Sequence, residues 1–328
     1  MACTNDKNMN VVFCTDTNYI MPSSVLIKSI SLNNKNTPID FYAIVDESVT
    51  ERDKSILVRE LSDNDSHNIT FLTVNGREYE NMPNLDVSHE YAVRNKITAT
   101  HTTKACYYRL SMANLLPQSV EKVIYFDCDI IVTQDLSDLW STNLEGKAVA
   151  AVVDEGEFQM HYHQLGFPPE FGYFNSGVMI IDISYWRKHN MFESFLSIIK
   201  EHAGRMRQHD QEILNIAFYN NVKRLPLKYN FQEHFFRKPK CIPAFYNKYS
   251  NEIEQAIVDI AVVHYTADKP WHKECNQPYR GQFLKYLKTT QWDAYRLKWK
   301  NKQFANSITI YRILIKLGLR KGLYRNLL

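Results

Sequence analysis

The sequence predicts an α/β fold in which helices flank a mostly parallel sheet. Short apolar runs alternate with helical patterns along most of the 328 residues, as in successive βαβ units. Polar residues directly follow several of these runs, where the carboxyl ends of parallel strands place ligand-binding groups. Because no repeat or low-complexity linker divides the chain, we expect one domain over residues 9–290. A disordered N-terminus at 1–8 would precede it, and a small C-terminal helical appendage at 291–328 would follow.

The first part of the chain predicts three strands with helices between them. The helix after the second strand has the clearest start, because Thr50 is a favourable N-cap residue. In order, we expect a strand at 10–14, a helix from Pro22 through Ile30, a strand at 39–45, a helix at 50–61 and a strand at 69–74.

The remaining elements continue this alternation, and three of the strands end on an acidic or imidazole side chain. A strand that stops at such a residue presents it at the edge of the sheet. We expect a helix at 107–116, a strand from 123 that ends at Asp127, a strand at 148–153 before Asp154, a turn and strand within 174–182, a helix at 210–219 and a strand at 260–263 before His264.

Asp127 and Asp129 form the most informative motif. They end the apolar run at 123–126, and strand side chains two positions apart point to the same side. Two convergent carboxylates are unfavourable unless a cation neutralises them, and oxygen ligands suit Mg²⁺ or Mn²⁺. The motif therefore predicts a divalent metal site that holds nucleotide phosphates. Asp63 and Asp65 have the same spacing but lie in a polar segment, which indicates a solvated loop.

Composition and absent motifs narrow the function. The chain has no glycine-rich dinucleotide fingerprint, no P-loop and no hydrolase nucleophile elbow. From residue 294 onward nine Lys or Arg occur with no Asp or Glu, while the remainder has 30 basic and 36 acidic residues, which argues against nucleic-acid binding. Six scattered cysteines without a Cys-x-x-Cys pair, and no recognisable signal peptide, favour free thiols in a reducing compartment.

A histidine and a lysine extend the predicted metal site. His264 follows an apolar run, and Lys269 and Trp271 come shortly after it. A histidine that joins two carboxylates suits Mn²⁺, and a lysine can hold a phosphate oxygen as a point charge.

Seven segments in order resemble family 8 of the retaining glycosyltransferases, whose members have the Rossmann-like GT-A fold. This family includes bacterial lipopolysaccharide galactosyl- and glucosyltransferases. The matching segments, from residue 11 to about residue 286, are FCTDTNY at 13–19, YYRL at 107–110, YFDCD at 125–129, AVVD at 151–154, YFNSGV at 173–178, HDQEILN at 209–215 and HYTADKPW at 264–271.

The resemblance implies a role for each matching residue. Mn²⁺, or Mg²⁺ in its place, would bind to Asp127, Asp129 and His264. Tyr19 would stack on the uracil base of a UDP-sugar donor, and Lys269 would grip its diphosphate. The complete set implied to bind the donor is Thr15, Asp16, Asn18, Tyr19, Arg109, Asp154, Asn175 and Lys269.

The resemblance places Gln211 beside the anomeric carbon on the reacting face. A neutral amide there favours same-face attack by the acceptor over a covalent intermediate, but Asp210 remains a possible nucleophile. Two positions depart from the family pattern: Ala267 stands where Gly is usual, and Glu212 stands where Asp is common. The implied activity is transfer of galactose or glucose from its UDP-sugar to a saccharide acceptor such as a bacterial cell-surface glycan or lipopolysaccharide core.

Two rival functions remain open. One is a self-glycosylating primer of the same family, in which one of the 20 tyrosines would be the acceptor. The other is a UDP-sugar-binding module without turnover. The aromatic, His- and Lys-rich segments at 155–171 and 232–249 are candidates for the acceptor side, with ordinary loop packing as the alternative.

The segment from Ser307 to Leu328 predicts an amphipathic basic helix. Arg312, Lys316 and Arg320 recur every four residues beside an apolar face, and the charges argue against a spanning helix. We expect it to anchor the protein peripherally on the anionic, cytoplasmic face of the cell membrane. Packing on the catalytic domain, with the basic face in water, is the alternative.

Overall fold

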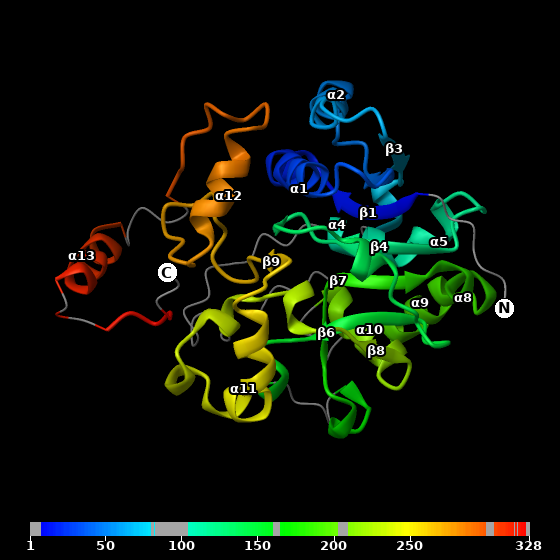
Figure 1. Ribbon diagram of the computed structural model, residues 1–328. Helices are drawn as coiled ribbons and strands as arrows, with labels where there is room; N and C mark the ends of the chain where they lie inside the picture. Colours follow the sequence, from blue (N-terminus) through cyan, green and yellow to red (C-terminus); the bar gives the residue numbers. More distant parts are fainter. Residues whose placement is uncertain are drawn as a thin grey trace.

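The computed structural model describes residues 8–79, 82, 104–159, 165–202, 209–299, 305–317, 319 and 321–325. A seven-stranded sheet runs through the centre, with helices on both faces (Figure 1). Its strands in spatial order are β3 (His67–Thr73), β2 (Ile39–Val45), β1 (Met9–Thr15), β4 (Lys122–Phe126), β7 (Phe174–Asp182), β6 (Val149–Val153) and β8 (Val222–Arg224).

The sheet is mostly parallel, as predicted, and one strand runs against the rest. Strands β3, β2, β1 and β4 pair in parallel, and β6 pairs with β8 in parallel. Strand β7 is antiparallel to both of its neighbours, β4 and β6. The beginning of β7 therefore lies at the same edge of the sheet as the ends of β4 and β6.

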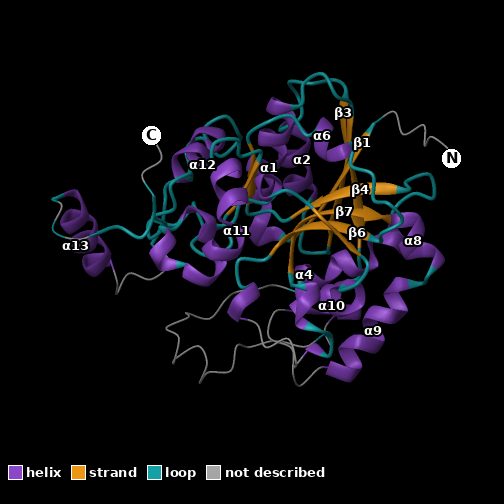
Figure 2. Cartoon of the chain, turned by 60° about the horizontal axis from the view of Figure 1, so that its bottom comes forward, coloured by secondary structure: helices purple, strands orange, loops and turns teal. Residues whose placement is uncertain are grey.

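The two faces of the sheet bury separate apolar cores. Along β1, Val11 and Phe13 belong to one core, while Val12 and Cys14 belong to the other, because successive strand side chains alternate. Figure 2 shows helices on both sides of the strands. The helices are α1 (Ile20–Asn33), α2 (Glu51–Arg59), α4 (Ala105–Tyr108), α5 (Met112–Leu115), α6 (Ser137–Trp140), α8 (Ile183–Lys188), α9 (Met191–His202), α10 (His209–Phe218), α11 (Pro243–Ala256), α12 (Arg280–Leu287) and α13 (Ala305–Lys316).

The N-terminus of α2 forms as predicted. Thr50 accepts a hydrogen bond from the backbone N–H of Asp53, and the Asp53 carboxylate accepts one from the backbone N–H of Thr50. This reciprocal capping box satisfies two donors that the first turn would otherwise leave unpaired.

Two predicted helices have different limits from those expected. Helix α1 begins at Ile20 and continues to Asn33, beyond the expected 22–30, and is buried on nearly all sides. The single helix predicted at 107–116 is wrong, because a 3₁₀ turn at Arg109–Ser111 separates α4 from α5. Leu116 is extended, as the residue before Pro117 usually is, and this ends α5.

A second, two-stranded sheet carries His264 and begins directly after Asp129. Strand β5 (Ile130–Val132) pairs antiparallel with β9 (Val262–His264), and Ile130 is the partner of His264. This pairing brings His264 next to Asp129, although the two residues are far apart in the sequence.

Helix α13 projects from the body of the protein in both views (Figures 1 and 2). The Arg312 guanidinium joins it to the body by hydrogen bonds to Asn276 Oδ1 and to the Lys273 carbonyl oxygen. The helix expected from Ser307 to Leu328 ends at Lys316, and the described residues beyond it are not helical. Among these residues, Tyr324 forms a bridge with Arg237. Within the described residues, no helix has the length and apolar character needed to cross a bilayer. Residues 1–7 lie outside the described residues, while Asn8 donates a hydrogen bond to Asp40.

Candidate active site

The candidate site lies at the edge of the sheet where the parallel strands end. Asp16 follows β1, Asp127 follows β4 and Asp154 follows β6. Asn175 lies at the start of β7, which reaches the same edge because β7 is antiparallel. His264 ends β9 beside them. The fold thus gathers residues from five strands at the position where α/β sheets bind ligands.

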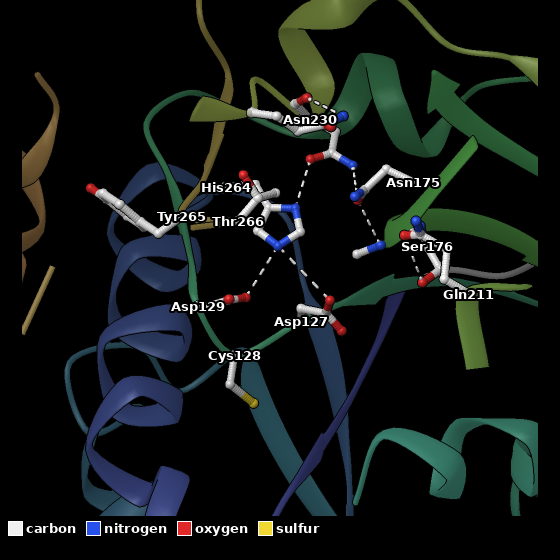
Figure 3. A network of polar contacts seen from close by, with 12 residues as sticks. Asp127, Cys128, Asp129, Asn175, Ser176, Gln211, Asn230, His264, Tyr265 and Thr266 are labelled. Atoms are coloured by element: carbon white, nitrogen blue, oxygen red, sulfur yellow. Dashed lines mark hydrogen bonds and ion pairs between the residues drawn. The ribbon is translucent and has the colours of Figure 1, made fainter. Parts of the chain in front are cut away.

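Asp127, Asp129 and His264 form a cluster that fits a divalent cation. One ligand atom from each side chain lies within 4.8 Å of the others. His264 Nε2 is 3.2 Å from Asp129 Oδ1 and 3.9 Å from Asp127 Oδ2 (Figure 3). The two aspartates lie in the turn between β4 and β5, and the Cys128 side chain between them points away into the core. Two carboxylates with one imidazole suit Mn²⁺, and the carboxylates alone also suit Mg²⁺.

Gly177 leaves the space that His264 occupies. A Cβ atom at this position would lie 2.2 Å from His264 Cε1 and 2.9 Å from Asp127 Oδ2. Any side chain would therefore force the imidazole or the carboxylate to move. The backbone N–H of Asp127 also donates to the Gly177 carbonyl oxygen at 2.8 Å, which fixes the start of the turn that carries Asp127 and Asp129.

Two cations already pair with the carboxylates of the cluster. Arg109 Nη2 donates to Asp127 Oδ1 at 2.7 Å, and Lys269 Nζ donates to Asp129 Oδ2 at 2.5 Å. Arg109 Nε also lies 2.9 Å from Asp210 Oδ2, and the guanidinium stacks over the Tyr125 ring at 4.4 Å. Cations at these positions can also bind the phosphates of a nucleotide.

The buried charges shift each other's protonation. Burial disfavours the ionised form of Asp129, but Lys269 and His264 outweigh it and hold the pKa of this carboxyl well below its ordinary value. Burial raises the pKa of Asp210 to about 6, against the opposing effect of Arg109. Burial lowers the pKa of Lys269, but Asp129, together with Tyr19 and Asp127, outweighs burial and the net pKa is raised. Asp129 and Lys269 are therefore a charged pair at neutral pH.

On the other side of the cluster, Asp154, Asn175 and Gln211 form a hydrogen-bonded group. Asp154 Oδ2 accepts from Asn175 Nδ2 at 2.9 Å and from Gln211 Nε2 at 3.1 Å. Gln211 Oε1 accepts from the backbone N–H of Ser176 at 3.0 Å. Burial, together with the neighbouring Glu155 charge, raises the pKa of Asp154. These hydrogen bonds fix the directions of polar groups that can hold sugar hydroxyls.

The residues predicted for the nucleotide lie at the end of β1. Asp16 Oδ1 caps the following 3₁₀ turn by accepting from the Asn18 backbone N–H at 2.8 Å. The Thr15 hydroxyl accepts from Ser23, which fixes it against α1. The Tyr19 ring packs edge-on against Trp271 at 6.0 Å, and burial raises the pKa of its hydroxyl to about 12. The structure thus brings the predicted residues around one site.

The two segments predicted for the acceptor side contact each other next to this site. Glu155 Oε2 accepts from His234, and Glu157 accepts from Lys248 Nζ and from the Tyr249 hydroxyl. Both carboxylates are therefore held in place by the second segment, and together the two segments form a wall beside the site. Residues 161–163, which contributed to the prediction, lie outside the described residues.

Sequence reasoning missed Asn230, which is fully buried and contacts both Asn175 and His264. The sequence feature that could have indicated its role is a polar asparagine between two aromatic residues, Tyr229 and Phe231. The control motif behaves as expected: Asp63 is 66% exposed and pairs with Lys28 at 2.8 Å. The cysteine prediction also agrees, because the five described cysteines are all free thiols.

The fold and the site define a GT-A glycosyltransferase. The chain belongs to glycosyl transferase family 8, whose sequence profile matches residues 10–275.

Similarity to individual proteins extends over most of the chain. General stress protein A of Bacillus subtilis is 30% identical over 295 residues, which cover 88% of this chain and 96% of that protein. A lipopolysaccharide 1,2-glucosyltransferase of Escherichia coli K12 is 28% identical, with 87% of this chain and 79% of that protein covered. A crystal structure of the galactosyltransferase LgtC with donor and acceptor sugar analogues superposes with a TM-score of 0.74 at 24% identity, covering 91% of this chain and 99% of LgtC.

Proposed function

We propose that this glycosyltransferase transfers a hexose from a UDP-sugar to a saccharide acceptor and retains the α configuration of the donor. The Asp127, Asp129 and His264 cluster, with Lys269 at its edge, carries this proposal. Such a set of carboxylates, imidazole and ammonium matches a nucleotide diphosphate bound with a divalent cation. Galactose and glucose are the favoured sugars because the named relatives transfer them.

The metal is proposed to be Mn²⁺, with Mg²⁺ as a possible substitute. A bound divalent cation would neutralise charge on the diphosphate. Lys269 and Arg109 exchange part of their pairing with the aspartates for phosphate oxygens when the donor binds. The residues around β1 hold the nucleoside, with Tyr19 stacking on uracil. Asp154, Asn175 and Gln211 orient the sugar through its hydroxyl groups.

In the proposed reaction, the bond between the anomeric carbon and the diphosphate oxygen breaks while the acceptor oxygen bonds to the same face of that carbon. The electron pair leaves with UDP, and the acceptor hydroxyl proton passes to the departing phosphate oxygen. Gln211 lies beside the reacting centre and stabilises the positively charged sugar through its amide oxygen. Asp210 is less suited as a nucleophile, because Arg109 holds it and its side chain is buried.

The acceptor is proposed to be a bacterial cell-surface glycan or a lipopolysaccharide core. The name of the Escherichia coli relative supports this class of acceptor. The wall formed by residues 155–157 and 232–249 is the proposed acceptor side, since it adjoins Asp154 and offers aromatic and charged groups.

The enzyme is proposed to work in the cytoplasm at the inner face of the membrane. The apolar side chains of α13 and of Leu317, which directly follows it, support this location, because Ile310, Ile313 and Leu317 are 56%, 49% and 65% exposed. Arg312 does not face outward with them: it binds the body of the protein, so the expected stripe of three basic residues must be revised. Arg320 lies outside the described residues. Lys316 and Lys321 are exposed and remain available for anionic lipid.

The decisive test is release of UDP from a panel of UDP-sugars in the presence of Mn²⁺, first without an acceptor. We expect slow hydrolysis of UDP-galactose or UDP-glucose and faster release when a saccharide acceptor is added. Binding of a UDP-sugar without any hydrolysis to UDP would support the binding module instead. Hexoses added to the protein itself, detected by mass spectrometry, would support the self-glycosylating primer.

A further inference from the structure

We propose that Asn230 is a positioning residue that holds the proton of His264 on Nδ1 and thereby keeps Nε2 free for the divalent cation. Asn230 Oδ1 lies 3.0 Å from His264 Nδ1, and Asn230 is fully buried. The inference rests on the metal site of the proposed function and adds the residue that prepares its imidazole ligand.

A chain of hydrogen bonds fixes which end of the Asn230 amide faces the imidazole. The backbone N–H of Gly177 can only donate, and it lies 2.9 Å from one end of the Asn175 amide, which must be the oxygen. The same oxygen receives the Asn230 Nδ2 group at 2.8 Å. Asn230 therefore turns its own oxygen toward His264, and an oxygen can only accept. The ring proton is therefore on Nδ1, the nitrogen that Figure 3 shows joined to Asn230.

The far end of the chain agrees with this direction. With its oxygen bound to Gly177 and Asn230, Asn175 directs its NH₂ group to Asp154 Oδ2 at 2.9 Å. A carboxylate accepts hydrogen bonds, so the donor and acceptor roles are consistent from Asp154 to His264. The relay joins the sugar side of the site to its metal side.

The backbone holds Asn230 against β9. The Phe231 N–H donates to the Val262 carbonyl oxygen at 2.8 Å, and the His264 N–H donates to the Phe231 carbonyl oxygen at 3.1 Å. These two bonds place residue 230 beside the imidazole whatever its side chain is. The side chain supplies the acceptor, and second-sphere acceptors of this kind orient metal-binding histidines and fix their tautomer.

The test compares two substitutions of nearly equal size, N230D and N230L. Affinity for Mn²⁺ alone is measured by electron paramagnetic resonance of the free ion, without donor or turnover. We expect N230L to raise the Kd for Mn²⁺ by about 10- to 100-fold. N230D should lose clearly less affinity than N230L, because a carboxylate can also hold the Nδ1 proton, although it leaves the Asn175 oxygen without this donor. Asn34 is the matched control, since it is also fully buried and hydrogen-bonded at both ends of its amide. N34L should leave the Kd unchanged.

Equal Mn²⁺ affinity in N230L and wild type would overturn the inference, as would an equal loss in N230D and N230L. If N230L does not fold, ¹⁵N NMR of the wild-type protein bound to diamagnetic Mg²⁺ shows which nitrogen of His264 carries the proton. The His264 signals are identified as those that disappear in H264Q. A protonated Nε2 would overturn the inference, and a protonated Nδ1 supports it. If the wild-type protein binds no divalent ion, both this inference and the proposed metal site are wrong. If it binds Mn²⁺ normally but does not turn over UDP-sugars, only the proposed reaction is wrong.

Discussion

Arg109 Nη2 donates to Asp127 Oδ1 at 2.7 Å, so a buried guanidinium holds one of the two carboxylates of the candidate metal cluster. The charge pair explains how the carboxylate remains close to Asp129 before a metal binds. It also orients the Asp127 oxygens, because Tyr125 donates to the same Oδ1 at 3.0 Å. The second oxygen then faces His264.

Replacement of a metal-binding carboxylate should abolish turnover. We expect D127A or D129A to lower Mn²⁺-dependent release of UDP by several hundredfold or more, equivalent to roughly 3–4 kcal/mol of transition-state stabilisation. The fold, followed by circular dichroism, should persist. D63A is the control, because Asp63 has the same motif spacing but lies on the surface. Equal activity in D127A and D63A would contradict the metal assignment.

The stereochemistry of the product and the role of Gln211 can be tested together. NMR of the product should show an α linkage, as in the donor. Q211A should reduce kcat with little change in the affinity for UDP, because the amide binds Ser176 and Asp154, on the side of the site proposed to hold the sugar. A β-linked product would exclude retention.

Two glycine substitutions test the space beside the imidazole. G177A should weaken Mn²⁺ binding and turnover, because the new methyl group would overlap His264 Cε1. G281A is the matched control: it lies in α12 with no atom within 4 Å of the added Cβ, and it should stabilise the fold by up to about 1 kcal/mol. Calorimetry and Mn²⁺ titration of both variants separate stability from binding. Normal Mn²⁺ affinity in G177A would show that the cluster does not need this space.

Asp210 should make the metal-free protein less stable as the pH rises. Burial raises its pKa to about 6, with Asp127 adding to the shift and Arg109 and Cys106 opposing it. A carboxyl whose pKa is higher in the folded chain contributes its full stability below the unfolded pKa, and this contribution is lost as the pH rises through the folded value. D210N cannot titrate, so its melting temperature relative to wild type should increase between pH 5 and pH 8. Over this interval the change corresponds to about 1–1.5 kcal/mol, because the rest of the effect falls below pH 5. A difference that does not vary with pH in EDTA would disprove the assignment.

The exposed apolar side chains of α13 and of Leu317, which directly follows it, should bind membranes. We expect I310S/I313S/L317S to lose at least about 100-fold in affinity for anionic phospholipid vesicles at low salt, since full burial of each such side chain is worth about 1.5–3 kcal/mol. Activity on a soluble acceptor should be unchanged. V258S is the surface control, because Val258 is 84% exposed and lies outside α13. Wild-type protein that ignores such vesicles would contradict the proposed location.

The sequence by itself predicted most strands of the central sheet, the start of α2 and the two carboxylates of the candidate metal cluster, but not β5, β8, α6, α8, α9, α11 or α12. These features depend on local properties: side-chain periodicity, the capping preference of Thr50 and an apolar run that ends in Asp127 and Asp129. The family motifs also named most of the residues that gather at the candidate site, because they are short segments with a fixed order along the chain.

Only the tertiary structure decided how those residues meet. The direction of β7 brings Asn175 to the ligand-binding edge, and the pairing of β5 with β9 brings His264 to Asp129. Asn230 has no local motif, and its role arises from contacts with residues distant in the sequence. The break between α4 and α5 likewise accompanies the turn at Arg109, whose partners Asp127 and Asp210 lie on other elements. Periodicity reports which face of an element is buried, but strand pairing and buried polar contacts depend on packing between distant parts of the chain.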